Sequence, residues 1–187
     1  MEFCPPQEYH IGEILVPAES IQERLALFAS EIAQKYHRQN LLVIGLLKGA
    51  FILTSDLVRE LYKAGLTDVD LDFMRVESYS NGTESSQNVK IIEDTRTNPC
   101  NRHVLLVDDI LDTTLSLAKT HQYAQNKGAQ SIESLALIAK PERHLTSYRP
   151  SYIGFTIPNI WIEGYGMDSF QHGRANPNIV VGPTFKR

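Results

Sequence analysis

The stretch VLLVDDILDTTLS (104–116) constrains the fold of this chain more than any other segment. It begins with four apolar residues in a row, which is typical of a strand buried on both faces in a parallel sheet. The acidic pair Asp108 and Asp109 follows at the point where such a strand would emerge. Asp112, three hydroxyl residues and a helical pattern that stops at Gly128 come next.

This order of elements predicts a binding site for a sugar phosphate. In α/β proteins, ligands bind beyond the carboxyl ends of the parallel strands. Backbone N–H groups and the helix dipole at a helix N-terminus bind a phosphate, so Thr113, Thr114 and Ser116 would surround that anion. The carboxylates that precede them would hold sugar hydroxyls or a metal ion.

The composition is that of a single domain. Of the 187 residues, 42% are hydrophobic, which is enough for one full core, while the length is too small for two large domains. The net charge is −4 and the basic residues are scattered, which argues against nucleic acid or an anionic membrane as the main partner. We find no apolar run of membrane-spanning length, and the start MEFCPPQEYH lacks the pattern of a signal peptide. Two cysteines are too few for a disulfide framework, so we expect a reducing, cytoplasmic location.

Strands alternate with helices along the chain, which predicts a doubly wound α/β sheet. Ser20 and Glu23 have the spacing of a capping box, so a helix is expected to begin there and to run to about Tyr36. A second helix should follow the tight turn at 48–50 and end at Gly65. The expected strands are 41–47, 69–74, 89–92, 104–107, 132–138 and 152–157, with 161–162 and 179–181 as pieces of a small C-terminal sheet.

Residues 78–88, SYSNGTESSQN, are polar and small and have no periodicity. They predict a long mobile loop. Such a loop would be suited to close over a site from which water must be excluded.

The stretch 104–116 resembles the signature of the type I phosphoribosyltransferases, in which a strand leads to two acids, two bulky apolar residues and Asp-Thr/Ser-Gly-x-Thr. The matching residues are Asp108, Asp109, Ile110, Leu111, Asp112, Thr113 and Ser116. Thr114 departs from the signature, because the family usually has glycine there. We expect a negative φ at Thr114, with its hydroxyl donating to the phosphate, since a β-branched residue at positive φ would be strained.

Four further segments are similar to one branch of that family, the hypoxanthine-guanine phosphoribosyltransferases. They are LLKGA (46–50), SYSNGTESS (78–86), GFTIPNIW (154–161) and GYGMD (164–168). The resemblance spans nearly the whole chain. It implies the α/β type I phosphoribosyltransferase fold, a mostly parallel twisted sheet flanked by helices with a small hood subdomain. One domain would cover 1–187, with a core of about 18–155 and a hood formed by 1–17 and 156–187. Ala50 replaces the usual second glycine of the first segment, so φ should stay negative there.

The resemblance implies a purine salvage enzyme, in which 5-phosphoribose passes from phosphoribosyl diphosphate to hypoxanthine or guanine with Mg²⁺, giving IMP or GMP. It also implies a homodimer or homotetramer. The resemblance implies catalysis by Asp112, and ribose and 5-phosphate binding by Asp108, Asp109, Thr113, Thr114, Leu115 and Ser116. It implies pyrophosphate binding by Lys48, Gly49 and Arg174, and purine binding by Lys140, Trp161 and Ile162. It also implies a flap at Ser78 and Tyr79, and magnesium binding by Asp108, Asp109 and Asp168.

Elementary chemistry agrees with several of these roles. An ammonium group has donors only, so Lys140 favours a 6-oxopurine over adenine. Magnesium prefers oxygen ligands and needs only one or two carboxylates when a diphosphate completes its shell. We expect Asp112 to lie among Asp108 and Asp109, where like charge would raise a carboxylate pKa and make a better proton acceptor.

Two other functions remain open at this point. One is a sister enzyme that prefers xanthine or guanine, which the residues around Trp161 do not exclude. The other is a nucleotide-sensing regulator of the same fold, although such proteins often carry an added basic nucleic-acid-binding element that is not found here. The chain has no HExxH, Gly-x-Ser-x-Gly or Walker lysine pattern, which disfavours zinc enzymes, hydrolases and P-loop proteins.

Overall fold

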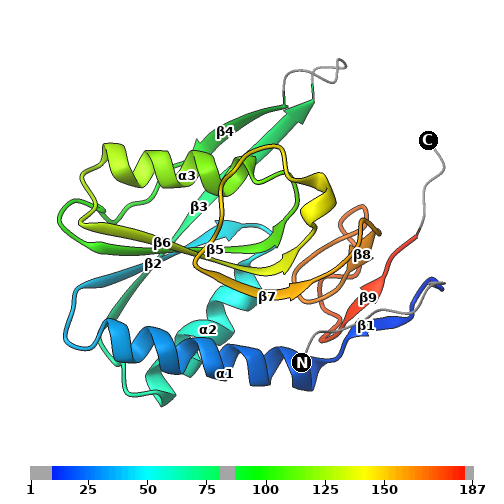
Figure 1. Ribbon diagram of the computed structural model, residues 1–187, viewed down its shortest axis with the longest axis horizontal. Coiled ribbons are helices and arrows are strands. Elements are labelled where there is room, and N and C mark those ends of the chain that lie inside the picture. Colours follow the sequence, from blue (N-terminus) through cyan, green and yellow to red (C-terminus); the bar gives the residue numbers. More distant parts are fainter. Residues whose placement is uncertain (1–9, 81–86, 184–187) are drawn as a thin grey trace.

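A six-stranded sheet forms the centre of the protein (Figure 1). The computed structural model describes residues 10–80 and 87–183, with the backbone alone at 78–80 and 87–88. The strands are β2 (Leu41–Leu47), β3 (Val69–Ser80), β4 (Gln87–Glu93), β5 (His103–Leu111), β6 (Ser131–Ala139) and β7 (Tyr152–Thr156). Their order is β4-β3-β2-β5-β6-β7, and all neighbours are parallel except β3 and β4.

Helices cover both faces of this sheet (Figure 1). α1 (Ala18–Lys35) and α2 (Phe51–Lys63) lie on one face, and α3 (Leu115–Asn126) lies on the other. Alternate residues of β5 pack into the two apolar cores, Leu105 toward α1 and α2 and Leu106 toward α3. The doubly wound arrangement expected from the sequence is therefore confirmed. It also explains the unbroken apolar run of β5, because a strand covered on both faces buries the side chains of both faces.

A second, three-stranded sheet lies at one end of the main sheet (Figure 1). It consists of β1 (Ile14–Val16), β9 (Ile179–Val181) and β8 (Ile162–Glu163) in that order, with antiparallel pairs. Segments from both ends of the described chain thus meet in one small sheet. The two C-terminal strand pieces expected from the sequence are confirmed.

The first helix begins earlier than its sequence pattern indicates. α1 starts at Ala18 with Pro17 as N-cap, and no side chain of the helix itself caps it. The capping box at Ser20 is therefore wrong, because Ser20 lies inside the first turn. Instead, the Asn178 side chain accepts the Ala18 N–H at 2.9 Å, so a donor at the helix start is satisfied by a residue distant in sequence.

The polar segment 78–88 is also more ordered than expected. β3 continues to Ser80 and β4 begins at Gln87, paired antiparallel with Ser78 opposite Val89. The remaining residues of the expected loop, 81–86, lie outside the described residues. Polar side chains hid this hairpin, since a strand at a sheet edge does not require apolar alternation.

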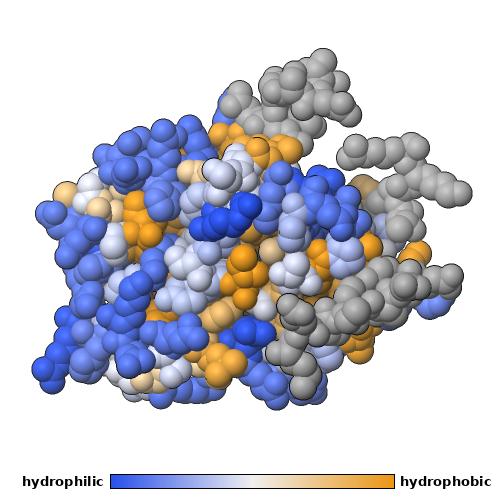
Figure 2. All heavy atoms as spheres, viewed as in Figure 1, coloured by the Kyte–Doolittle hydropathy of each residue, from blue (hydrophilic) through white to orange (hydrophobic). Residues whose placement is uncertain are grey.

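Hydrophilic residues cover most of the face shown in Figure 2, and the hydrophobic residues on it occur in small groups. Within the ranges described above, none of the helices combines the length and the apolar character that crossing a membrane requires.

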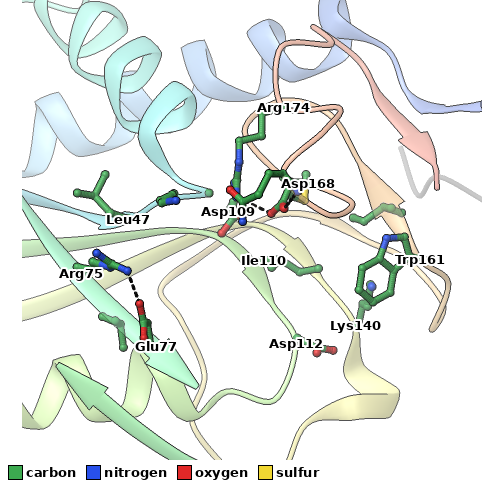
Figure 3. Close-up of a pocket in the computed structure, with 16 residues that line it drawn as sticks. Leu47, Arg75, Glu77, Asp109, Ile110, Asp112, Lys140, Trp161, Asp168 and Arg174 are labelled. Atoms are coloured by element: carbon green, nitrogen blue, oxygen red, sulfur yellow. Dashed lines mark hydrogen bonds and ion pairs between the residues drawn. The ribbon is translucent and has the colours of Figure 1, made fainter. Parts of the chain in front are cut away.

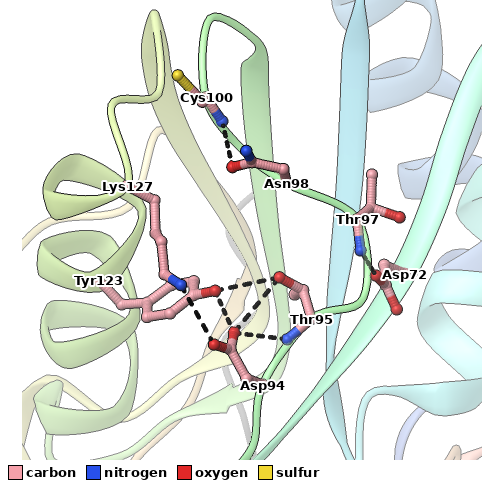
Figure 4. Close-up of polar contacts among 8 residues, drawn as sticks. All are labelled: Asp72, Asp94, Thr95, Thr97, Asn98, Cys100, Tyr123 and Lys127. Carbon is pink, nitrogen blue, oxygen red and sulfur yellow. Dashed lines mark hydrogen bonds and ion pairs between the residues drawn. The ribbon is translucent and has the colours of Figure 1, made fainter.

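A polar cluster joins α3 to the segment that follows β4 (Figure 4). The Asp94 carboxylate accepts hydrogen bonds from the Tyr123 hydroxyl and from the Thr95 N–H, and it lies 3.5 Å from the Lys127 ammonium. Burial alone would raise the Asp94 pKa, but these donors outweigh burial and lower it from its ordinary value of 3.8. The cluster therefore stabilises the folded state most when Asp94 is ionised.

We expect Tyr123→Phe to lower the free energy of unfolding by about 0.5–1 kcal/mol, because it removes a hydrogen bond to a charged group that is half exposed. The native pKa of Asp94 is lowered, so this contribution is present near neutral pH and is lost as pH falls through that pKa. Urea unfolding of both proteins at pH 7 and pH 3 measures it. Tyr62→Phe, at a largely exposed position on α2, is the matched control and should change little at either pH.

Candidate active site

A cavity of about 440 Å³ opens where the carboxyl ends of the parallel strands meet the small sheet (Figure 3). Its walls come from the end of β2 and the turn after it, the middle of β3, the end of β5 and the residue that follows it, the residue after β6, and the segment 161–174. The lining residues are Leu47, Lys48, Gly49, Arg75, Val76, Glu77, Asp109, Ile110, Asp112, Lys140, Trp161, Ile162, Met167, Asp168, Gln171 and Arg174. The residues predicted to contact purine and pyrophosphate all lie among them, together with Asp109, Asp112 and Asp168. Asp108 and residues 113–116 do not.

The turn after β2 is packed tightly against two other segments. The Leu47–Lys48 peptide is cis. A side chain at Gly49 would lie 1.9 Å from the Asp109 carboxylate, and one at Gly166 would lie 2.0 Å from the Gly49 carbonyl oxygen. Glycine at position 166 therefore allows two backbones to approach, and glycine at position 49 leaves space for the Asp109 carboxylate. Ala50 has a φ of −77°, negative as expected.

Asp108 and Asp109 are buried near the end of β5. The Asp109 N–H donates to the Asp108 carboxylate at 3.1 Å. Burial raises the pKa of both carboxyl groups, and the charge of Asp109 raises the pKa of Asp108 further. The positive charge of Arg174 acts to lower the Asp109 pKa. The like-charge effect expected from the sequence is thus found within this pair.

The segment that carries Asp168 and Arg174 forms a compact loop beside Asp109 (Figure 3). The Arg174 guanidinium lies 2.6 Å from the Asp168 carboxylate and also donates to the Gly166 carbonyl at 2.6 Å. The Gln171 N–H donates to the second Asp168 oxygen at 2.7 Å. Arg174 and Asp168 are therefore held at the cavity wall, each with its charge largely compensated by the other.

Lys140 and Trp161 lie at one end of the cavity (Figure 3). Burial lowers the pKa of Lys140, which is only 6% exposed; the nearby Asp112 raises this pKa and Arg143 lowers it. The Trp161 indole N–H donates to the Ser169 hydroxyl at 2.7 Å, while its side chain remains partly open. An aromatic face beside a buried ammonium is suited to a planar ligand with a hydrogen-bond acceptor on its edge.

Asp112 does not lie in the environment expected for it. Its carboxylate is paired with the guanidinium of Arg143, whose Nε donates to Oδ1 at 2.5 Å. The expected placement among Asp108 and Asp109 is wrong, because β5 continues to Leu111 and carries Asp112 beyond the buried pair.

The hydroxyl-rich turn forms the start of α3, outside the lining of the cavity. No side chain caps this helix, and its first intrahelical bond runs from the Ala118 N–H to the Thr114 carbonyl, so the preceding N–H groups are available to an anion. Thr114 has a φ of 70°, so the expected negative φ is wrong. Its hydroxyl contacts the Thr113 carbonyl, the Thr146 hydroxyl and the Thr146 N–H, and these bonds hold the strained conformation.

The predicted flap lies at the tip of the β3–β4 hairpin. The backbone of Ser78 and Tyr79 belongs to β3, and their side chains and residues 81–86 lie outside the described part of the chain. The closing movement of this flap stays a prediction.

Sequence reasoning missed three charged residues near the cavity. Arg75 and Glu77 line it from β3 and are ion-paired at 2.5 Å, and Arg143 reaches Asp112 from the turn after Lys140. Alternation along β3 was the available signal for the first two, since residues two apart on a strand face the same side. For Arg143 no local pattern indicates a partner in 104–116.

The fold and the cavity define an α/β protein with a charged cavity at the carboxyl ends of its parallel strands. Residues 15–169 match the family described as phosphoribosyl transferase domain. The hypoxanthine-guanine phosphoribosyltransferase of Aquifex aeolicus is 36% identical over 170 residues, which cover 90% of this chain and 93% of that one. The protein of the same name from Bacillus subtilis is 33% identical, with 93% and 94% covered.

A solved structure of the hypoxanthine phosphoribosyl transferase of Trypanosoma cruzi superposes with a TM-score of 0.86 at 33% identity, covering 95% of each chain. The chain therefore belongs to the phosphoribosyl transferase family and, within it, to the hypoxanthine-guanine phosphoribosyltransferases.

The strain at Thr114 leads to a prediction on stability. Thr114→Val removes the hydrogen bonds of the hydroxyl and keeps the β-branched side chain. Thr114→Gly removes the same bonds but also relieves the strain of the left-handed backbone conformation. We expect both variants to be less stable than the wild type, with glycine the more stable of the two by about 1 kcal/mol in urea unfolding. Thr146, whose φ is not positive, is the control position, and there glycine should be no better than valine. A Thr114→Gly protein less stable than Thr114→Val would contradict the role of strain.

Proposed function

We propose that this protein transfers 5-phosphoribose from phosphoribosyl diphosphate to N9 of hypoxanthine or guanine, forming IMP or GMP and pyrophosphate in purine salvage. The arrangement of charge in the cavity carries the proposal. Asp109 and Arg174 lie toward one part of it, while Lys140 and Trp161 lie at another (Figure 3), and Lys48 also lines it. The names of the relatives support the same reaction.

Departure of the pyrophosphate needs positive charge. As the C1–O bond of the sugar breaks, charge builds on the leaving group and must be neutralised. Lys48 and Arg174 supply cations at the cavity wall. In this proposal the start of α3 binds the 5-phosphate, through the N–H groups of 115–117 and the hydroxyls of Thr113 and Ser116.

The base would be held between Trp161 and Lys140. Trp161 offers an aromatic face for stacking, Ile162 offers backbone groups to the purine edge, and Lys140 donates to the exocyclic oxygen. Asp112 would accept the proton of purine N7 as N9 attacks C1 of the sugar.

A magnesium ion fits the residues only in part. Asp109 and Asp168 line the cavity with carboxylate oxygens, whereas Asp108 does not line it. Among the described residues no three acids, histidines or cysteines form a metal-binding group. This donor set suits an ion that takes one or two protein carboxylates and most of its oxygens from a diphosphate and water. We therefore propose Asp109 and Asp168 as ligands and Asp108 as an indirect contact. When bound, Mg²⁺ would neutralise the diphosphate charge.

An assay with each base tests the proposal. The protein is incubated with Mg²⁺, phosphoribosyl diphosphate and hypoxanthine, guanine, xanthine or adenine, and nucleotide formation is followed. We expect IMP and GMP to form. Faster turnover of xanthine would indicate the sister enzyme, and binding without turnover of any base would indicate a regulator.

Replacement of Lys140 tests base recognition. Lys140→Met keeps the bulk and removes the donor, so binding of hypoxanthine and guanine should weaken by about 1.5–3 kcal/mol, with adenine use rising relative to them. Steady-state kinetics with each base measure this. Lys119→Met, at an exposed position on α3, is the control. Unchanged kinetics with both 6-oxopurines would remove Lys140 from the site.

Replacement of Asp112 tests the chemistry. Asp112→Asn keeps the shape and removes the base, so kcat should fall by roughly 10²–10⁴ while phosphoribosyl diphosphate binding remains nearly intact. Turnover and calorimetric affinity are measured on the same protein, with the exposed Glu142→Gln as control. Near-normal turnover would limit Asp112 to a structural role.

We also infer a homodimer or homotetramer, a cytoplasmic location, a closing flap around Ser78 and Tyr79, and a hood formed by 1–17 and 156–187. Family membership supports all of these. Light scattering measures the oligomer, and cell fractionation measures the location.

A further inference from the structure

Arg143 contacts the proposed catalytic carboxylate without lining the cavity itself. Its Nε donates to Oδ1 of Asp112 at 2.5 Å, and both side chains are a little over one-third exposed. Among the described residues, no other group hydrogen-bonds to this carboxylate. One Asp112 oxygen is therefore engaged, and the other is left for a ligand.

The backbone around Arg143 is fixed by bonds to the strand end that carries Asp112. The Arg143 N–H donates to the Lys140 carbonyl at 3.0 Å, and the Lys140 N–H donates to the Leu111 carbonyl at 3.0 Å. The Leu145 N–H donates to the Thr113 carbonyl at 3.1 Å. The backbone of the turn with Arg143 is thus held on both sides of Asp112, which places the base of the Arg143 side chain beside that residue.

The ion pair between Asp112 and Arg143 also affects Lys140. Asp112 and Lys140 both line the cavity and interact electrostatically, yet the Lys140 ammonium makes no hydrogen bond to any residue in the described ranges. A carboxylate and an ammonium that line the same cavity can pair with each other in the absence of a stronger partner. A guanidinium is such a partner, because its planar N–H groups match a carboxylate. Pairing with Arg143 therefore leaves both groups free to act on a ligand.

The purine presents two neighbouring atoms that need opposite partners. Its exocyclic oxygen accepts a hydrogen bond, and its N7–H, which the base carries and which becomes acidic as N9 attacks, donates one. We propose that Arg143 is a positioning residue, which holds Asp112 by one oxygen so that the other faces N7 and Lys140 stays free for the exocyclic oxygen. This inference rests on the proposed function.

A double-mutant cycle tests the inference. Wild type, Arg143→Gln, Asp112→Asn and the double variant are compared by kcat and by KM for hypoxanthine and phosphoribosyl diphosphate. Arg143→Gln should lower kcat by about 10- to 100-fold, the cost of a misplaced catalytic group, while KM for phosphoribosyl diphosphate changes by less than about twofold. In the Asp112→Asn background, Arg143→Gln should lower kcat by less than about threefold, because Arg143 acts through Asp112.

Two further variants separate positioning from folding. Arg143→Lys keeps the charge and should retain more activity than Arg143→Gln. Arg149→Gln makes the same substitution at an exposed arginine of the same segment, which donates to the Tyr148 carbonyl, and should leave kcat unchanged. Thermal melting checks that all variants fold.

Each result decides a different question. No turnover by the wild type would overturn the proposed function and this inference with it. Turnover by the wild type with full additivity in the cycle would overturn the role of Arg143 alone, as would a kcat for Arg143→Gln equal to that of Arg149→Gln. If Arg143→Gln fails to fold, the cycle with Arg143→Lys decides, and additivity there would equally overturn it.

Discussion

The close approach of three backbone segments around Gly49 is the constraint on which the cavity depends. The turn after β2 packs against the carboxylate of Asp109 on one side and against Gly166 on the other, with no space for a side chain. This contact fixes the distance between the acids of β5 and the loop that carries Asp168 and Arg174. Because protein interiors are close-packed, a methyl group at Gly49 would have to displace the Asp109 carboxylate, and one at Gly166 would have to displace the backbone at Gly49.

The loop itself is anchored from outside the cavity. Tyr165 is buried, has a φ of 48°, and donates from its hydroxyl to the Asp56 carboxylate of α2 at 2.6 Å. Burial and the neighbouring carboxylate raise the pKa of Tyr165, so this donor remains protonated. An unfavourable backbone conformation is thus compensated by a contact to a neighbouring helix.

Much of the fold was predictable because it follows from apolar periodicity. The buried run 41–47 matches β2 at both ends, and the alternation of strands and helices fixed the doubly wound class. The start of α1 was not predictable from local pattern, since its donor is satisfied by Asn178. Thr114 was misjudged for the same reason, because the bonds that hold its backbone come from Thr146.

The same distinction between local patterns and distant contacts applies to the candidate site. Lys48, Lys140 and Asp168 belong to short sequence motifs, and all three line the cavity. These residues were predictable because each motif lies within one short segment of the chain. The partner of Asp112 was missed, because Arg143 is distant in sequence and an ion pair leaves no periodic signal. Local patterns thus identify the groups that face a ligand better than the groups that hold them in place.

The fastening of α3 has a mechanical consequence. Near its start, Thr114 is bonded to Thr146, and near its end Tyr123 and Lys127 contact Asp94 at the base of the β3–β4 hairpin. A helix of this kind behaves as a rigid rod. Any displacement of the hairpin base must therefore tilt the rod or break one of its two attachments, so the N-terminal end of α3 is coupled to strand β4 through the length of the helix.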